Sequence, residues 1–183
     1  EDLNYWRQRG FQNGRWLPPL ADKTMVRLEP PHRAPDSRPV IAFVGNLRTP
    51  NNISGITWFI ESVMPSICES EPDAQLVIAG SSPSREFVAS CVTNPNIRVI
   101  ADPPNINEVY GLADVLINPA VWSSGVNLKS VDMLSSGKPV ISTRMGVRGL
   151  PDDALVCFSV SDDAEAFSGA VVRALRNRES PSD

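Results

Sequence analysis

Apolar and polar residues follow two alternating patterns along residues 39–178. Short runs of consecutive apolar residues predict strands buried on both faces, and longer stretches with apolar residues three or four apart predict helices between them. The expected strands are residues 40–45, 75–80, 97–100, 114–119, 139–143 and 154–159, and the expected helices are residues 53–68, 84–92, 106–112, 128–136 and 164–175. Regular alternation of strand and helix is typical of an α/β fold. We therefore expect a doubly wound, mostly parallel, Rossmann-like sheet with helices on both faces.

Residues 1–38 lack this periodicity and are punctuated by prolines, which fix φ and disfavour helix in the residue before them. We expect only a short helix over residues 2–9 and one short strand there. The sequence predicts an N-terminal arm and linker over 1–38, one folded domain over 39–178 and a tail over 179–183. The first residue is not Met and the chain begins in charged sequence, which indicates a domain cut from a longer protein.

The overall composition excludes several classes of function. The formal net charge is -4, which gives no global signal for nucleic acid, so an anion site must be built from local groups. No apolar run approaches the roughly 18 residues of a transmembrane helix, and the N-terminus is not a signal peptide. Three cysteines without a C-x-x-C pair do not predict a metal site or a disulfide. We expect a cytoplasmic protein, or one held peripherally at the inner face of the membrane.

Ligands of open parallel sheets bind beyond the carboxyl ends of the strands. This rule predicts that the binding residues follow directly after the apolar runs. They are Gly45, Asn46, Gly80, Ser81, Ala101, Asp102, residues 119–124 and Thr143.

The segment 118–140 carries the strongest local signal, a strand followed by a Ser/Gly-rich loop and a helix. Residues 123–125 suit an N-cap, and free amides from Gly125 to Lys129 would form a phosphate site to which Lys129 adds a cation. Asp132 lies seven residues after Gly125, about two helical turns, and its carboxylate can accept two hydrogen bonds from a sugar diol. The structural alternatives stay open: Asp132 as a solvated carboxylate, Lys129 as a surface cation.

At these residues the sequence resembles a known family. Residues 132–140, DMLSSGKPV, are similar to a helix that reads E-A-M-A-x-G-x-P-V, and residues 124–129, SGVNLK, to the variant G-G-x-x-L-K. The segments VGNLRTPNNISGITWFIESVMPSI, EPDAQLVIAG and YGLADVLINPA add weaker matches in the same order. The chain thus resembles, over residues 17–175, the C-terminal, donor-binding domain of GT-B fold glycosyltransferases of the retaining group 1 type.

The resemblance implies a role for each matched position. The donor, a nucleotide-sugar, would be a substrate, with no separate cofactor and no metal. A missing N-terminal domain would bind the acceptor and supply any catalytic base, so no catalytic residue is assigned here. The implied donor-site residues are Gly125, Val126, Asn127, Leu128 and Lys129 at the diphosphate, Asp132 at the ribose, Gly45, Asn46 and Arg48 on the phosphate side, Ala101 and Asp102 at the base, and Ser124 at the first acidic position of the family.

The sequence also departs from the family at the same site. Asn46 and Asn51 or Asn52 stand where family members often carry Arg and Lys, Ser124 replaces a Glu, and Asp132 shortens the second Glu. One hypothesis is therefore the donor-binding half of a retaining glycosyltransferase that is inactive as an isolated domain. The alternative is a catalytically degenerate GT-B module that serves as a binding or structural domain. A GT-B sugar-nucleotide epimerase is a weaker third, because carboxylates and His are scarce here.

Overall fold

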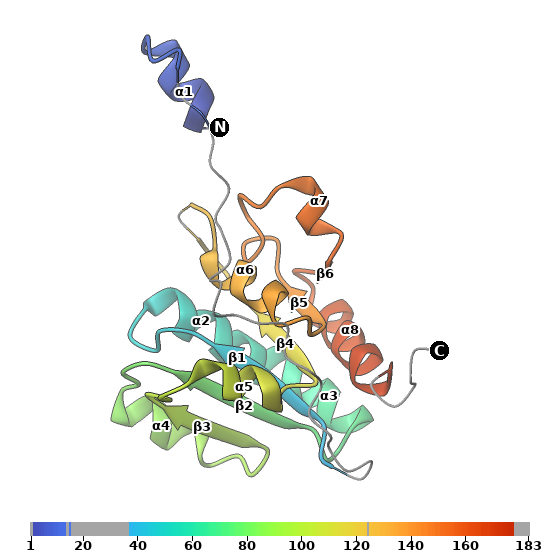
Figure 1. Cartoon of the computed structure of the whole chain (residues 1–183). Coiled ribbons are helices and arrows are strands. Elements are labelled where there is room, and N and C mark those ends of the chain that lie inside the picture. The colour runs from blue at the N-terminus through green and yellow to red at the C-terminus, as the bar shows by residue number, and fades with distance from the viewer. Residues whose placement is uncertain (1, 14, 16–36, 124, 178–183) are drawn as a thin grey trace.

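The computed structural model describes residues 2–13, 15, 37–123 and 125–177. Its centre is one six-stranded parallel sheet with the strand order β3-β2-β1-β4-β5-β6, covered by helices on both faces (Figure 1). The strands are β1 Val40–Val44, β2 Gln75–Gly80, β3 Ile97–Ala101, β4 Val115–Asn118, β5 Val140–Ser142 and β6 Phe158–Val160. The predicted parallel, doubly wound sheet is confirmed.

Each central strand buries both of its faces. In β1, Ile41 and Phe43 pack into one hydrophobic cluster, while Val40, Ala42 and Val44 pack into the other. Alternate side chains of a strand point to opposite faces, so a continuous apolar run supplies two cores at once. Full burial stabilises a large apolar side chain by about 1.5–3 kcal/mol.

The helices divide between the two faces. Packed on the Ile41 face are α2 Pro50–Trp58, the π-helical turn η1 Phe59–Val63, α3 Met64–Ser70, α4 Arg85–Cys91 and α8 Ala164–Asn177. The other face carries α5 Ile106–Leu112, α6 Leu128–Ser135 and α7 Asp152–Leu155. The strand order runs outward from β1 through β2 to β3, and then from β4 through β5 to β6. The order therefore reverses between β1 and β4, which are paired neighbours.

The helix predicted over 53–68 is continuous but changes its winding. It begins earlier, at Pro50, which suits the first position of a helix because proline has no amide to leave unpaired. The amide of Met64 donates to the carbonyl of Phe59, five residues back. Pro65 follows directly, and its ring would clash with the carbonyl four residues before it in a regular α-helix. The wider turn relieves that clash.

One strand prediction needs correction in the fold. Residues 154–159 were expected to form one strand, but Ala154 and Leu155 end the short helix α7 and the strand begins only at Phe158. Asp152 and Asp153 lie in the first turn of α7, where carboxylates favour a helix. The helix expected over residues 2–9 is α1 Asp2–Gln8, whereas most of the arm, its expected strand and the tail lie outside the described residues.

Within the described ranges, no helix combines the length and the apolar character needed to cross a bilayer.

Candidate functional site

The strand order reverses between β1 and β4, and ligands of open α/β sheets bind at such a reversal, between the loops that follow the two strands. We call this place the crevice. Lys129, in the first turn of α6, extends its side chain across this crevice. Its Nζ donates a 2.7 Å hydrogen bond to Oδ1 of Asn52 in the first turn of α2. The ammonium also lies 4.6 Å from the centroid of the Phe43 ring. The helix that follows β1 and the helix that follows β4 are thus joined through the Lys129 ammonium.

Lys129 is held with less water around it than an ordinary surface lysine has. Burial lowers its pKa from 10.5 to about 8. Its partners are a neutral amide and an aromatic face, and no carboxylate pairs with it among the described residues. A partly dehydrated cation without a counter-ion is a favourable position for a bound anion, because the anion would supply the missing charge.

The loop between β1 and α2 is fixed by its own hydrogen bonds. Oδ1 of Asn46 accepts the amide of Arg48 at 2.9 Å. The backbone carbonyl of Asn46 accepts Nδ2 of Asn52 at 2.8 Å and the Thr49 hydroxyl at 2.7 Å. Asn52 therefore holds the loop with its nitrogen and Lys129 with its oxygen. The side chain of Asn46, by contrast, is already engaged within the loop.

A pocket of about 360 Å³ lies where β1, β2 and β3 end; we call it the edge pocket. Its lining consists of Val44, Gly45, Gly80, Ser81, Asp102, Pro103 and Ile106. A Cβ on Gly80 would collide with the carbonyl oxygen of Gly45, so only glycine allows the two loops to approach this closely.

The edge pocket is bordered by unusual backbone. Asp102 has a φ of 47° and Ser82 a φ of 53°, although neither is glycine. The amide of Ser82 donates a 2.9 Å hydrogen bond to the carboxylate of Asp102, which fixes both turns. Strained residues of this kind cluster at functional sites, so their presence beside the pocket supports a binding role.

The start of α6 differs from the sequence prediction. The helix begins at Leu128 with Asn127 as the N-cap, and within the described part of the chain no side-chain hydrogen bond caps it. Gly125 precedes it in the loop with a φ of 86°, which is incompatible with a helical turn. The expected N-cap over residues 123–125 is therefore wrong. Gly125 and Asp132 do not lie on one helix either, because Gly125 belongs to the loop before α6. Ser124 lies outside the described residues.

A buried polar network lies beneath the first turn of α6. Nδ2 of Asn118 donates to Oγ of Ser130 at 2.8 Å and to the carbonyl of Gly146 at 3.1 Å. Oγ of Ser130 donates to the same carbonyl at 2.6 Å. Asn118 and Ser130 are both fully buried, and Oδ1 of Asn118 has no hydrogen-bond partner among the residues that the structure describes. The network joins β4, α6 and the loop after β5, so it fixes the helix turn that carries Lys129.

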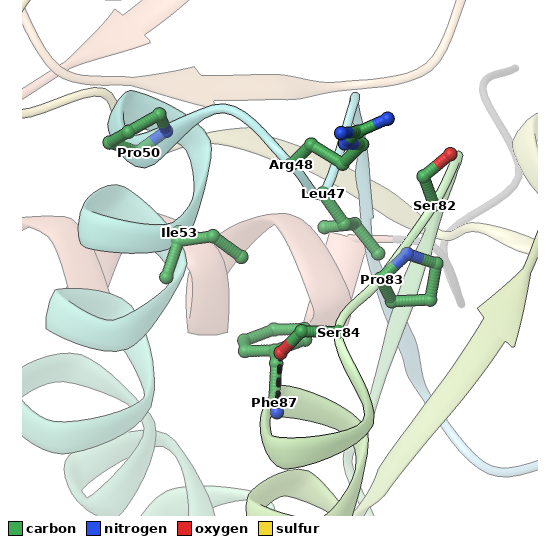
Figure 2. A pocket seen from close by; sticks show the side chains of 8 residues that line it. All are labelled: Leu47, Arg48, Pro50, Ile53, Ser82, Pro83, Ser84 and Phe87. Atoms are coloured by element: carbon green, nitrogen blue, oxygen red, sulfur yellow. Dashed lines mark hydrogen bonds between the residues drawn. The ribbon is translucent and has the colours of Figure 1, made fainter.

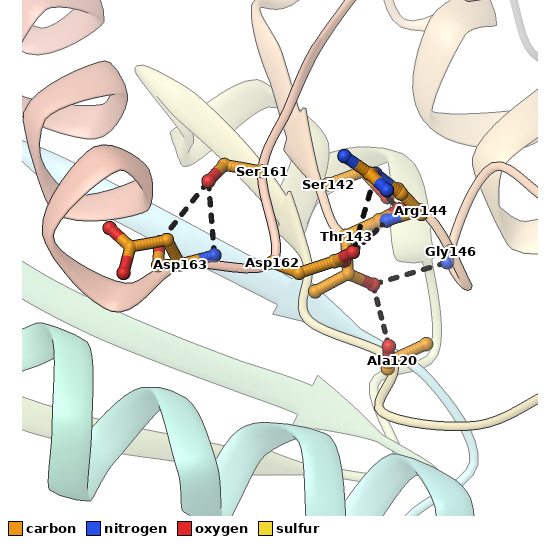
Figure 3. A network of polar contacts seen from close by, with 8 residues as sticks. All are labelled: Ala120, Ser142, Thr143, Arg144, Gly146, Ser161, Asp162 and Asp163. Carbon is orange, nitrogen blue, oxygen red and sulfur yellow. Dashed lines mark hydrogen bonds and ion pairs between the residues drawn. The ribbon is translucent and has the colours of Figure 1, made fainter.

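A second set of contacts holds the loop after β4 from the side of β5 (Figure 3). Oγ1 of Thr143 donates to the carbonyl of Ala120 at 2.6 Å and accepts the amide of Gly146 at 3.2 Å. Farther along, the guanidinium of Arg148 donates to the carbonyl of Ser123 at 3.2 Å. The loop that leads into α6 is therefore braced from one side.

Asp132 lies on the α5 side of α6. The pKa of the Tyr110 hydroxyl is raised, first by burial and then by the negative charge of Asp132. Tyr110 belongs to α5, the helix that also supplies Ile106 to the edge pocket. On the same helix, Lys129 contacts Asn52 of α2.

Arg48 lines a different cavity, which we call the Arg48 groove (Figure 2). Its volume is about 580 Å³, and its lining consists of Leu47, Arg48, Pro50, Ile53, Ser82, Pro83, Ser84 and Phe87. The hydrogen bond from the Leu47 amide to the Ser81 carbonyl, 2.9 Å long, lies between this groove and the edge pocket.

The structure brings the predicted residues together in part. Gly45 and Asp102 both line the edge pocket, and Ala101 directly precedes Asp102 in the chain. Lys129 contacts Asn52, which holds the loop that begins at Asn46. Val126 packs beside Gly149 in the loop before α6. Sequence patterns did not predict the buried Asn118–Ser130 pair, Tyr110 or the bridging role of Asn52. A polar residue inside the apolar run VLIN was the available signal for Asn118.

Comparison with known proteins identifies the family of the chain and its fold. The family Glycosyl transferases group 1 matches residues 38–177. An uncharacterized 44.6 kDa protein in the cps region of Klebsiella pneumoniae is 28% identical over 144 residues, which cover 75% of this chain and 37% of that protein. The chain therefore spans little more than a third of that curated relative.

Three solved structures share the fold. WaaG, a glycosyltransferase involved in lipopolysaccharide biosynthesis, has a TM-score of 0.63 at 17% identity, over 87% of this chain and 46% of WaaG. The C-terminal domain of the group 1 family protein LpcC from Francisella tularensis has a TM-score of 0.54 at 18% identity, over 76% and 81% of the two chains. Anabaena HepE in complex with UDP has a TM-score of 0.57 at 10% identity, over 76% and 39%. By the family match over most of its length, the chain belongs to the group 1 glycosyl transferases.

Proposed function

We propose that this chain is the donor-binding half of a retaining glycosyltransferase, which moves a sugar from a nucleotide-sugar to an acceptor. The observation that carries the proposal is Lys129, a half-buried cation at the reversal of strand order that has no counter-ion among the described residues. A donor diphosphate would supply that counter-ion. Anabaena HepE, which shares the fold, was solved in complex with UDP, which supports a nucleotide as the ligand class.

In this proposal, each part of the donor binds to a different set of residues. The diphosphate would lie at Lys129 and the amides from Gly125 to Leu128, with Gly45 and Asn46 on its other side. The base would enter the edge pocket beside Ala101 and Asp102, and Asp132 would accept hydrogen bonds from the ribose. The donor is itself the substrate, so the proposal includes no cofactor and no metal. A further domain of the longer protein would bind the acceptor and supply any catalytic base.

A second candidate function has its own support. The side chain of Asn46 is engaged within its loop, and Asn52, which contacts Lys129, is neutral, so neither asparagine adds positive charge beside Lys129. A donor site with so few cations is expected to bind weakly. This favours a degenerate module that keeps the fold for packing or partner binding.

Calorimetric titration with UDP, GDP and ADP, each beside its nucleoside, distinguishes the two. The donor-site proposal predicts that one diphosphate binds and that its nucleoside binds far more weakly, because the diphosphate meets Lys129. Failure of all three diphosphates at millimolar concentration would favour the degenerate module.

A further inference from the structure

We propose that the Arg48 groove binds an amphiphilic anion, a single alkyl chain that carries a phosphate group. The groove lies between the loop from β1 to α2 and the loop from β2 to α4. Its volume of about 580 Å³ falls within the range of about 300–1,000 Å³ that is typical of ligand pockets.

The lining of the groove suits an alkyl chain. Leu47 is buried, and the half-buried side chains of Ile53 and Phe87 pack against the same core. Pro50 and Pro83 add further apolar surface. The Ser84 hydroxyl caps α4 by accepting the Phe87 amide at 3.1 Å, so the position of Phe87 is fixed. Each methylene buried here is expected to raise the affinity up to about fourfold.

The charge of the groove suits a phosphate. Arg48 is the one charged residue in the lining, and its guanidinium makes no hydrogen bond or ion pair with the described residues. Figure 2 shows Arg48 and Ser82 near one end of the lining, with Phe87 at the other. A guanidinium donates two parallel hydrogen bonds to a phosphate, so an anionic head at Arg48 would leave its chain on the apolar residues.

The groove shares a wall with the edge pocket. Gly45 and Ser81 line the edge pocket, whereas Leu47 and Ser82 line the groove, and the Leu47–Ser81 hydrogen bond joins the two loops between them. A phosphate at Arg48 would therefore lie across this wall from the proposed nucleotide. Resting on the proposed function, this placement makes the groove a second site beside the nucleotide, separate from the acceptor site of the further domain.

Amide NMR titrations of the full chain test the proposal with octyl, nonyl and decyl phosphate, each below its micelle concentration. The expected shifts map to residues 47–53 and 82–87, and the affinity rises about two- to fourfold per methylene. Arg48→Gln is expected to weaken binding by about two- to fivefold. The exposed Arg173 on α8 gives the matched control Arg173→Gln, which should leave binding unchanged. The neutral probe 1-octanol should bind the wild type and Arg48→Gln equally.

Three outcomes would overturn the proposal: shifts that map elsewhere, for example to the exposed Trp122 and Leu128; inorganic phosphate binding as tightly as decyl phosphate; or equal effects of the two arginine substitutions. Titration of the same samples with UDP separates this test from the proposed function. If alkyl phosphates bind at the groove and no nucleotide binds at all, the groove assignment stands and the proposed donor site falls. If Arg48→Gln weakens UDP instead of alkyl phosphate, Arg48 belongs to the nucleotide site and the groove proposal is wrong.

Discussion

The ammonium of Lys129 lies 2.7 Å from Oδ1 of Asn52, across the point where the strand order of the sheet reverses. Asn52 also holds the carbonyl of Asn46 through its amide nitrogen. One neutral side chain therefore links the loop after β1 to the cation of α6. The family resemblance led us to note the asparagines at 51 and 52 as missing cations, but in the fold Asn52 positions a lysine that comes from elsewhere in the sequence.

Burial of Lys129 makes stability depend on pH. In the unfolded chain this lysine keeps its proton up to about pH 10.5, whereas in the folded chain it loses the proton near pH 8. The unfolded state binds more protons between these values, so stability rises with pH in that window. We expect wild type to gain stability relative to Lys129→Met between pH 7.5 and about pH 9.5, measured by urea denaturation. An equal change in the free energy of unfolding with pH in the two proteins would contradict this expectation.

The close approach of the first two strand ends requires glycine at position 80. Gly80→Ala would place a methyl group against the Gly45 carbonyl oxygen, and we expect a loss of about 1–3 kcal/mol in the free energy of unfolding. Gly111 in α5 has open space around its Cβ position, so Gly111→Ala is the control and should be neutral or stabilising by up to about 1 kcal/mol. Equal effects of both substitutions in thermal or urea denaturation would show that the two loops separate readily.

The buried network under α6 can be tested at Ser130. Ser130→Ala removes its hydrogen bonds to Asn118 and Gly146, and we expect a loss of about 1–3 kcal/mol. Ser135 on the same helix bonds only to the carbonyl of Val131, one turn back, so Ser135→Ala should change stability by less than about 0.5 kcal/mol. Denaturation curves that show no difference between the two variants would contradict a structural role for the network.

The sequence predicted the sheet well because its signal is local. Runs such as QLVIAG are buried on both faces, and the strand Gln75–Gly80 begins and ends at the predicted residues. The prediction was wrong at ALVCFS because an apolar run alone does not distinguish strand from helix, and the two aspartates before it favour a turn of helix.

The site was predictable only where it depends on strand ends. The rule about carboxyl ends identified Gly45 and Asp102, which share the edge pocket. It could not identify the Lys129–Asn52 contact or the Asn118–Ser130 pair, because each joins residues whose proximity exists only after folding. The N-cap was misplaced because a serine and glycine cluster predicts a helix start, whereas the left-handed φ of Gly125 delays it.

The pH dependence of nucleotide affinity tests the central claim most directly. Calorimetry should compare the tightest-binding nucleoside diphosphate at pH 7 and pH 9.5, in wild type and in Lys129→Met. If the diphosphate pairs with the Lys129 ammonium, wild-type affinity falls by about tenfold or more as the free protein's pKa of about 8 is passed, and Lys129→Met binds weakly at both pH values. Wild-type affinity equal at the two pH values, or full affinity in Lys129→Met, would contradict the donor site described here.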